Sequence, residues 1–535
     1  MKFKCFSKRI MMIGWKRIVV CILFVQTIIV SIAQTEMMRN PILSGCHPDP
    51  TICRVENDYY VCCSSFTWFP GLPIYHSRDL VHWELVSHVI DREGMVTLDG
   101  VKDKDGVWAP SLRHHRDTWY VFCNVSNGGN FFVTAKNVCG PWTNPIFIRN
   151  EQGEKMVGID PDIFWDDDDK AYVLGNHGSF PGRKYNASTA IWIQEIDLAT
   201  GILRGERTYI STGHAFNAKY VEAPHLYKIG KKYVLLLAEG GTDYNHSETV
   251  MTSDKLLGPY LAQDVNPVLS QRQMGHDADI QCVGHCDLVQ TPQGNWYAVA
   301  LGKRMVETKS FTRETFLCPV EIQNGQFIFN PGYGYMTEKI PRPRLPWTPL
   351  GDQRTAWYYE RIPHVKFDAW KDDQLTLRLQ PETIDSLTSP ALVMRKTSPL
   401  GFETTVSLSF QTKRLNEQAG LVLYRNDNAY IAVLKTAGQL LVVIKNKGRK
   451  VIEATVSYLP KDVMLRLKAD GLNASVMYAG SDSIWQQVTT VSLLPLVEDA
   501  KVNRFNGLGV GMYASSNSQK SKAEAIFSNF NYTEK

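Results

Sequence analysis

The sequence has few charged residues and no long amphipathic helical pattern. Of its 535 residues only 21% are Asp, Glu, Lys or Arg, whereas 11% are aromatic, which is typical of a folded globular protein and not of a disordered one. A chain of this length exceeds one ordinary hydrophobic core, so we expect two domains.

A basic surface is also missing. The formal charge is +4, but residues 1–33 hold six Lys or Arg and no Asp or Glu, so the remaining chain carries −2. The sequence has no basic cluster that would indicate binding to nucleic acid or to an acidic membrane surface. The oligomeric state stays open, and a homo-oligomer is one of the alternatives.

Long hydrophobic runs are absent after residue 33. Before it, a basic segment, Lys2–Arg17, precedes an apolar run, Ile18–Ala33, that ends in small residues. This layout is typical of a secretory signal peptide, here residues 1–33, and predicts export to the periplasm or the extracellular space with no membrane span after its removal. An uncleaved N-terminal anchor is the alternative, because the apolar run is long for a signal.

Cysteine is missing after Cys318. Of 11 cysteines, nine lie between the signal and this residue, and export would allow disulfides among them. An odd number leaves at least one thiol free unless a bond joins two chains. Cys282 and Cys286 lie near His276 and His285 and raise the alternative of a metal site, although zinc prefers more ligands at close spacing. We favour the interpretation that both are small buried hydrophobic residues.

A repeated layout dominates the first 330 residues. It begins at Cys46–Tyr60, where an acid beside proline is followed by a short apolar run, a turn and a tyrosine-centred strand. Five copies align on Tyr60, Tyr120, Tyr172, Tyr233 and Tyr297, with spacings of 60, 52, 61 and 64 residues. Four short strands with turns take about 40–50 residues, so the copies predict a five-bladed β-propeller with insertions over residues 34–340.

Three carboxylates occupy matching positions in these copies. Eleven or twelve residues before the aligned tyrosine stand Asp49, Ala109, Asp160, Glu222 and Cys286. If the first strand of each blade lines the central channel, residues at one register lie at one height around one axis. The simpler interpretation, that each acid caps a turn beside proline, suits one Asp-Pro pair better than three matched acids.

The pattern changes in the last third of the chain. A proline-spaced connector, Ile340–Pro349, follows the repeats, and we assign residues 341–356 to a stiff linker. From residue 357 onward, strands of alternating polarity such as Phe402–Phe410 predict an antiparallel β-sandwich over residues 357–535. The predicted fold class is all-β, a five-bladed β-propeller followed by a C-terminal β-sandwich.

Three converging carboxyls can hydrolyse a glycosidic bond. Hydrolysis with inversion needs one protonated carboxyl to assist the leaving oxygen and one carboxylate to activate water on the opposite face of the sugar. A third negative charge near the acid would keep its proton on at neutral pH.

The motifs around these acids resemble glycoside hydrolase family 43, in particular its two-domain β-xylosidase-like members with a concanavalin A-like sandwich. The resemblance covers nearly the whole chain after the signal. It implies Asp49, beside Pro50, as general base and Glu222, in a Glu-Ala-Pro motif, as general acid. It also implies that Asp160, rather than Asp162, modulates the pKa of the acid and orients it.

The same resemblance implies a sugar-binding set. The stretches Ser64–Ser77, Gly284-His285 and Thr312–Leu317 are similar to the xylosidase-like branch. They imply Phe66, Trp108, His285 and Arg313 around the sugar, and Phe505 as the sandwich residue that closes the pocket. Ordinary core packing is the alternative for Phe66, Trp68, Trp108, His285 and Phe505.

Members of this family commonly hold a central cation, such as calcium, through water molecules near the histidine that corresponds to His285. Calcium prefers oxygen ligands. We therefore expect that any ion near His285 is mostly hydrated and structural, that the protein binds no metal directly, and that no cofactor is required.

The expected activity is that of an exported, inverting exo-glycosidase that releases terminal xylose from β-1,4-xylo-oligosaccharides during hemicellulose breakdown. An α-L-arabinofuranosidase that removes arabinose side chains is the near alternative, since the two sugars present similar hydroxyl geometry. A non-catalytic carbohydrate-binding propeller is the alternative from another class, and the presence of all three acids argues against it. The expected partner is a xylo- or arabinoxylo-oligosaccharide.

Overall fold

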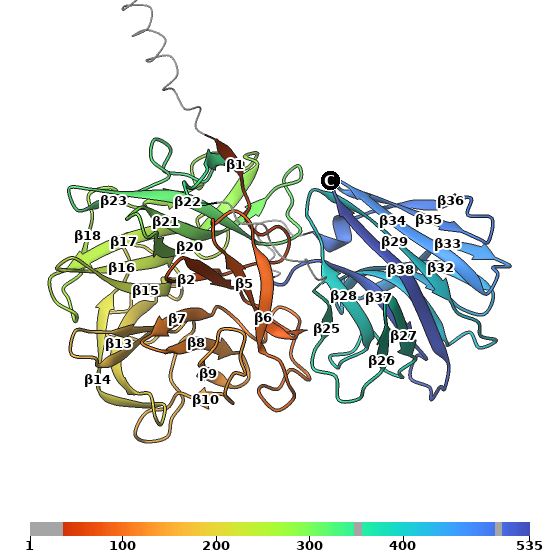
Figure 1. Ribbon diagram of the computed structural model, residues 1–535, viewed down its shortest axis with the longest axis horizontal. Helices are drawn as coiled ribbons and strands as arrows, with labels where there is room; N and C mark the ends of the chain where they lie inside the picture. Colours follow the sequence, from red (N-terminus) through yellow and green to blue (C-terminus); the bar gives the residue numbers. More distant parts are fainter. Residues whose placement is uncertain (1–35, 347–355, 498–504) are drawn as a thin grey trace, which may run out of the picture.

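A computed structural model describes residues 36–346, 356–497 and 505–535, which form two β-rich bodies side by side (Figure 1). The predicted signal peptide and most of the predicted linker, residues 347–355, lie outside the described residues. Within the described ranges, no helix is long and apolar enough to cross a membrane.

The first body is a propeller of five antiparallel sheets. Blade one contains β2 (Thr51–Val55), β3 (Asp58–Cys62), β5 (Gly71–Ser77) and β6 (Glu84–Ile90), and blade two contains β7 (Ser111–His115), β8 (Thr118–Val125), β9 (Gly129–Ala135) and β10 (Ile146–Phe147). Blade three contains β11 (Asp162–Trp165), β12 (Ala171–His177), β13 (Ala190–Asp197) and β14 (Ile202–Ser211). Blade four contains β15 (Glu222–Ile229), β16 (Lys232–Glu239), β17 (Ser247–Ser253), β18 (Leu261–Ala262) and β19 (Leu269–Ser270), and blade five contains β20 (Ile280–Gln290), β21 (Trp296–Arg304), β22 (Glu314–Gln323) and β23 (Gln326–Phe329).

The first strands of the five blades, β2, β7, β11, β15 and β20, contact one another in a closed ring. Alternating apolar residues on each blade pack against the next blade, so one hydrophobic cluster lies between each pair of neighbours. Outside the blades, β1 (Met37–Arg39) pairs with β24 (Lys339–Pro341) and ties the two ends of the propeller together. These contacts confirm the predicted five-bladed propeller.

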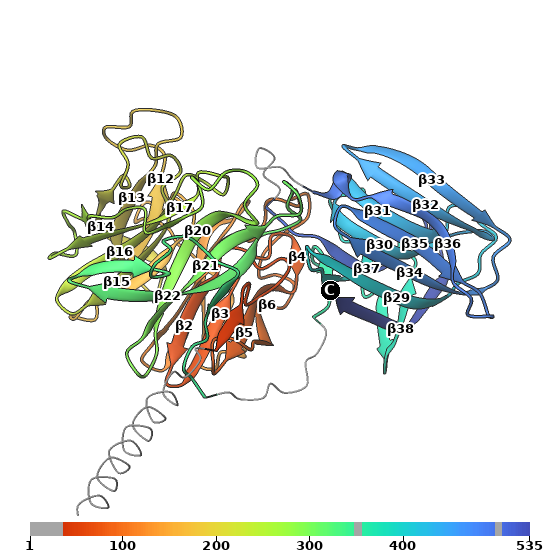
Figure 2. The ribbon, with the colours of Figure 1, turned by 90° about the horizontal axis from the view of Figure 1, so that it is seen from above.

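The second body is a sandwich of two antiparallel sheets, seen from another side in Figure 2. One sheet has the order β33 (Arg449–Ser457), β32 (Gln439–Asn446), β31 (Ala429–Lys435), β30 (Gln418–Asn426), β37 (Gly509–Ser515), β28 (Ala391–Lys396), β25 (Tyr358–Glu360), β4 (Trp68–Phe69). The other has the order β26 (Asp368–Lys371), β27 (Gln374–Arg378), β38 (Glu524–Glu534), β29 (Gly401–Ser409), β34 (Asp462–Asp470), β35 (Asn473–Ala479), β36 (Gln486–Ser492). A short 3₁₀ helix, η1 (Leu494–Leu496), follows β36.

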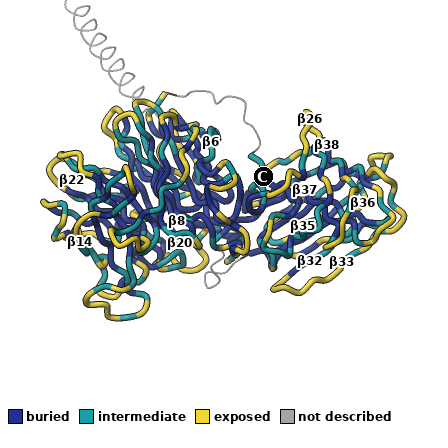
Figure 3. Tube along the Cα trace, turned by 90° about the horizontal axis from the view of Figure 1, so that it is seen from below, coloured by how far each residue is buried: buried dark blue, intermediate teal, exposed yellow. Residues whose placement is uncertain are grey.

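The two bodies share a sheet, because β4 belongs to the propeller segment and pairs with β25 of the sandwich. Beside this pairing, the buried Arg361 guanidinium forms an ion pair with Asp103 of the propeller and donates to the carbonyl of Val101. Buried segments continue from one body into the other (Figure 3). The sandwich is therefore fixed against the propeller.

None of the nine cysteines of the described residues takes part in a disulfide. Cys282 and Cys286 are buried on β20, and Cys286 packs in the hydrophobic cluster between blades four and five. No group of three metal-binding side chains occurs in the described ranges. The favoured interpretation of these two residues as small buried hydrophobic side chains agrees with this packing.

Candidate active site

The acids of blades one and three lie on matching backbone kinks. Asp49 and Asp160 each precede a proline, each has φ of 53°, and each stands two residues before the first strand of its blade. Positive φ is uncommon outside glycine. The shared kink explains why both carboxyls enter the channel at one height.

Blade four reaches the channel by a different route. There the residue before proline is Ala223, with φ of 48°, and Glu222 itself begins β15. A bulge between Glu222 and His225 interrupts the pairing with β16. Glu222 therefore enters the cavity from one residue further upstream than the two aspartates.

Blade five departs from the aligned register. His285, with φ of 55°, faces the cavity two residues before Asp287, just as Asp49 and Asp160 stand two residues before Thr51 and Asp162, and Cys286 is packed in the core. The repeat had aligned Cys286 with the acids because the first hairpins differ in length: Val55 pairs with Asp58 in blade one, whereas Gln290 pairs with Trp296 in blade five.

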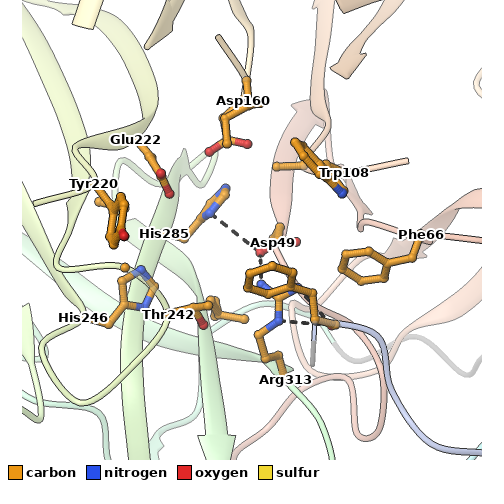
Figure 4. A pocket seen from close by; sticks show the side chains of 16 residues that line it. Asp49, Phe66, Trp108, Asp160, Tyr220, Glu222, Thr242, His246, His285 and Arg313 are labelled. Atoms are coloured by element: carbon orange, nitrogen blue, oxygen red, sulfur yellow. Dashed lines mark hydrogen bonds and ion pairs between the residues drawn. The ribbon is translucent and has the colours of Figure 1, made fainter. Parts of the chain in front are cut away.

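The acids line a cavity of about 160 Å³ at the end of the propeller channel (Figure 4). Its walls include every site residue predicted from the sequence, namely Asp49, Phe66, Trp108, Asp160, Glu222, His285, Arg313 and Phe505. Trp68, in contrast, packs on Tyr358 in the core shared with the sandwich, with the ring centroids 5.7 Å apart.

The carboxyl of Asp49 is fixed on both oxygens. Ser64 Oγ donates to Oδ2 at 2.5 Å, and Arg313 Nη1 donates to Oδ1 at 2.7 Å. Burial acts to raise the pKa of Asp49, but the Arg313 guanidinium and the Ser64 hydroxyl outweigh it, and the pKa lies below its ordinary value. Asp49 is therefore ionised and oriented.

Asp160 and Glu222 have the opposite character. Burial and the charge of Asp49 raise the pKa of Asp160 to about 7. Burial, then the charges of Asp160 and Asp49, raise the pKa of Glu222 well above its ordinary value. Two carboxyls that repel each other in a buried site do not both ionise readily, so Glu222 keeps its proton at neutral pH.

Arg313 connects the two domains at the cavity. Its Nη2 and Nε donate to the carbonyl of Phe505 at 3.0 and 3.3 Å. The rings of Phe66 and Phe505 lie 5.4 and 5.2 Å from its guanidinium carbon. The guanidinium is thus fixed by two aromatic rings, a carbonyl and the Asp49 carboxylate.

Sequence reasoning assigned no role to several residues of the site. Ser64 begins the stretch Ser64–Ser77, which is similar to the xylosidase-like branch, but the sequence did not predict its hydrogen bond to Asp49. Tyr220, Thr242 and His246 line the cavity from loops of blade four and carry no motif. His246 Nδ1 lies 2.8 Å from the carbonyl of Cys282 and must donate to it, so Nε2 is the unprotonated nitrogen of the neutral ring.

The two histidines of the cavity are neutral bases of low strength. Burial lowers the pKa of His285 to about 3 and that of His246 to about 4. His285 Nδ1 lies 3.8 Å from Asp49 Oδ1, which is beyond a hydrogen bond. Both rings therefore leave the proton chemistry to the three acids.

A five-bladed propeller joined to a sandwich, with two protonatable carboxyls facing one fixed carboxylate, defines a glycoside hydrolase. Residues 38–327 match the family described as "Glycosyl hydrolases family 43", and residues 352–533 match "Beta xylosidase C-terminal Concanavalin A-like domain". The chain belongs to glycoside hydrolase family 43, and its substrate is a carbohydrate.

Its relatives cover nearly the full chain. A "Xylosidase/arabinosidase" of Butyrivibrio fibrisolvens is 34% identical over 93% of this chain and 99% of its own length. A "Non-reducing end alpha-L-arabinofuranosidase BoGH43B" of Bacteroides ovatus is 34% identical over 94% and 96%. The crystal structure of a xylan beta-1,4-xylosidase from Bacillus halodurans superposes with a TM-score of 0.85 at 29% identity, over 93% of this chain and all of the other.

Proposed function

We propose that this glycosidase acts by inversion and releases terminal xylose from β-1,4-xylo-oligosaccharides. The observation that carries the proposal is the split between a fixed, ionised Asp49 and a protonated Glu222 across one small cavity. One carboxylate and one carboxylic acid are the two groups that inverting hydrolysis requires, and retaining hydrolysis uses the same pair, so the anomeric configuration of the product distinguishes the two.

Each acid has its own role in this proposal. Asp49 removes a proton from the attacking water, and Glu222 gives its proton to the oxygen of the leaving sugar. Asp160 supports the protonated state of Glu222 through its negative charge. The water and the leaving group must lie on opposite faces of the sugar, so the product has the anomeric configuration opposite to that of the substrate.

The cavity favours action at a chain end. Phe505 and its loop come from the sandwich and form one wall, and Arg313 behind it is held by the Phe505 carbonyl. Phe66 and Trp108 form the wall from the propeller. A cavity of about 160 Å³ with these walls suits one terminal sugar, with the rest of the oligosaccharide leaving through the mouth.

A terminal α-L-arabinofuranosyl group is the second candidate substrate. The name of the Bacteroides ovatus relative, an arabinofuranosidase at 34% identity, favours it. A purely sugar-binding propeller would not require the pKa values of its acids to be driven apart, whereas an inverting hydrolase does.

The test is a paired assay with nitrophenyl β-xyloside and nitrophenyl α-L-arabinofuranoside. A higher kcat/KM on the xyloside supports the proposal, and a higher value on the arabinofuranoside selects the second candidate. Asp49→Asn serves as the control and is expected to abolish turnover of both. Turnover retained in that variant would remove Asp49 from the mechanism.

We also propose that the enzyme is exported to the periplasm or the extracellular space after removal of residues 1–33. The basic and then apolar pattern of the sequence supports this. N-terminal sequencing of the mature protein tests it: a start near residue 34 is expected, and a mature protein that retains Met1 would contradict cleavage.

A further inference from the structure

A second ring of side chains lies one layer beneath the catalytic carboxyls. Residues two apart on a strand point to the same side, so Thr51, Asp162 and Asp287, which stand two residues after Asp49, Asp160 and His285, form their own layer. Arg113 and His225 join this layer through their contacts with it. Each blade contributes one member, and the ring consists of Thr51, Arg113, Asp162, His225 and Asp287.

Among the described residues, Arg113 is the one cation that lies between the two carboxylates of this ring, Asp162 and Asp287. Its Nη1 donates to Asp287 Oδ2 at 2.8 Å and to Thr51 Oγ1 at 3.1 Å, and its Nη2 donates to Asp162 Oδ2 at 3.1 Å. Burial acts to raise the pKa of both aspartates, but Arg113 outweighs it and holds both values below the ordinary one. Both carboxylates are therefore ionised, and the single guanidinium balances one of their two negative charges.

Arg113 and Asp162 both contact one nitrogen of His225. Arg113 Nη2 lies 2.8 Å from Nδ1 and Asp162 Oδ2 lies 3.2 Å from it, so the ring is held between the guanidinium and the carboxylate. The His225 ring centroid lies 6.4 Å from that of His285, and its Nε2 has no hydrogen-bond partner within the described parts of the chain.

These residues do not fit calcium. Calcium takes six to eight oxygen ligands, and the oxygens of Asp162 and Asp287, the nearest carboxylates of the layer, already hold a guanidinium. A divalent ion could reach these oxygens only by displacing the guanidinium. The oxygens of these side chains are thus unavailable for direct binding of calcium, and the mostly hydrated cation expected near His285 stays a prediction that removal of metal ions with EDTA tests.

We propose that Arg113 is the resident cation of the channel, which takes the place of a bound metal ion and, through His225, positions the layer that supports Asp160 and His285. Arg113 touches no reacting atom and is a positioning residue. Its catalytic effect rests on the proposed function, whereas its role as the resident cation shows in the stability of the protein without substrate.

The guanidinium can be reached from the far end of the channel. A cavity of about 360 Å³ opens there and is lined by Arg54, Arg113, His115, Trp165 and Trp296 among others. The Arg113 side chain keeps 14% of its surface exposed. A small cation added to the solution can therefore enter the space that a truncated side chain would leave.

The test compares the wild-type enzyme with Arg113→Ala, Arg113→Lys and Arg54→Ala. Arg54 is a matched control, because it lines the same cavity but donates to the backbone carbonyls of Gln290 and Glu56. Tm and kcat are measured after dialysis against EDTA, and again after addition of calcium chloride or of guanidinium chloride at low millimolar concentration.

The wild-type enzyme is expected to keep its Tm and kcat in EDTA and to show no shift with calcium. Arg113→Ala should lower both Tm and kcat, because it leaves two buried carboxylates without their cation. Guanidinium should restore part of both in this variant and neither in Arg54→Ala. Arg113→Lys keeps the positive charge but lacks the planar guanidinium with its several donors. Compared with Arg113→Ala, its Tm should therefore recover more than its kcat.

Two outcomes would overturn the proposal. One is a wild-type enzyme that loses Tm in EDTA and regains it with calcium, which would assign the channel to a metal ion. The other is an Arg113→Ala variant with unchanged Tm and kcat. If Arg113→Ala does not fold, Arg113→Lys with wild-type kcat would refute the positioning role, and the EDTA comparison on the wild type still decides the metal question. If the wild type has no activity on any glycoside, the proposed function fails, while the Tm comparison still tests Arg113.

Discussion

Nη1 of Arg313 lies 2.7 Å from Oδ1 of Asp49, and the same guanidinium donates to the carbonyl of Phe505 in the sandwich. One arginine therefore links the ionised carboxylate of the propeller to a loop of the other domain. The sandwich contributes to the charge balance of the site as well as to its wall.

Removal of residues 350–535 should therefore severely reduce activity or solubility. The deletion takes away β25, the partner of β4, as well as the Phe505 carbonyl that orients Arg313. It also exposes apolar surface around Trp68. The measurement is soluble yield and turnover of xylobiose. Phe505→Ala is the milder comparison, since it removes the ring and keeps the carbonyl. A soluble propeller fragment with undiminished activity would show that the sandwich is dispensable.

Glu222→Gln should impair substrates according to their leaving groups. Xylo-oligosaccharides need the proton of the acid, so their kcat should fall about 10²- to 10⁴-fold, the usual contribution of general acid catalysis. Aryl glycosides with good leaving groups should lose much less. The check is kcat for xylobiose and for dinitrophenyl xyloside in both proteins, and an equal loss on both would count against Glu222 as the acid.

Asp160→Asn should raise the stability of the protein at high pH and lower its activity there. The pKa of Asp160 is raised to about 7 in the folded protein, so the folded state binds more protons than the unfolded one below that pH. Stability contributed by this carboxyl is thus present at low pH and is lost as pH rises through about 7. The neutral asparagine avoids this loss and should raise Tm at about pH 8 more than at about pH 4.

The same change should lower the activity at high pH. Without the charge of Asp160 the pKa of Glu222 falls, because that charge is one cause of its elevation. The basic limb of kcat/KM should then move to lower pH. An unmoved limb, together with a Tm change that is equal at both pH values, would contradict the assigned role of Asp160.

The fold and the three acids of the cavity could be predicted from the sequence because the features that place them are local, whereas the resemblance to a family implied its other predicted wall residues, Phe66, Trp108, His285, Arg313 and Phe505. An acid or aromatic beside proline, repeated at blade spacing, reveals Asp49, Asp160 and Glu222 without any knowledge of loops. Arg113 and His225 carry no such signal, since the sequence around a single arginine or histidine on a strand does not show whether the side chain lies in the channel or on the surface. Their contacts form only once five strands meet at one axis.

The repeat alignment of blade five was off by one residue for a related physical reason. The alignment on the tyrosines assumes first hairpins of equal length, but Val55 pairs with Asp58 in blade one and Gln290 pairs with Trp296 in blade five. Gly284 itself leaves room for a neighbour, since a Cβ there would lie 2.9 Å from Nε2 of His246. Such close approaches depend on loops from another blade, and one sequence does not reveal them.

Gly158→Ala should destabilise the loop that carries Asp160. Gly158 has φ of +86°, and a Cβ there would lie 1.7 Å from the carbonyl oxygen of Asn176. Gly153, with φ of +84° and open space around it, is the matched control, because Gly153→Ala carries the backbone strain without the clash. We expect Gly153→Ala to cost about 1 kcal/mol of unfolding free energy and Gly158→Ala clearly more. Equal losses in denaturant unfolding would show that the loop adapts.

The anomeric configuration of the first sugar released tests the central claim most directly. Proton NMR during the first minutes of hydrolysis of a β-xyloside records the product before it equilibrates in water. A single displacement by a water molecule activated by Asp49 predicts that α-xylose appears first. If β-xylose appeared first, one of the carboxylates would have to act as a nucleophile, and the assignment of Asp49 as base and Glu222 as acid of an inverting hydrolase would be wrong.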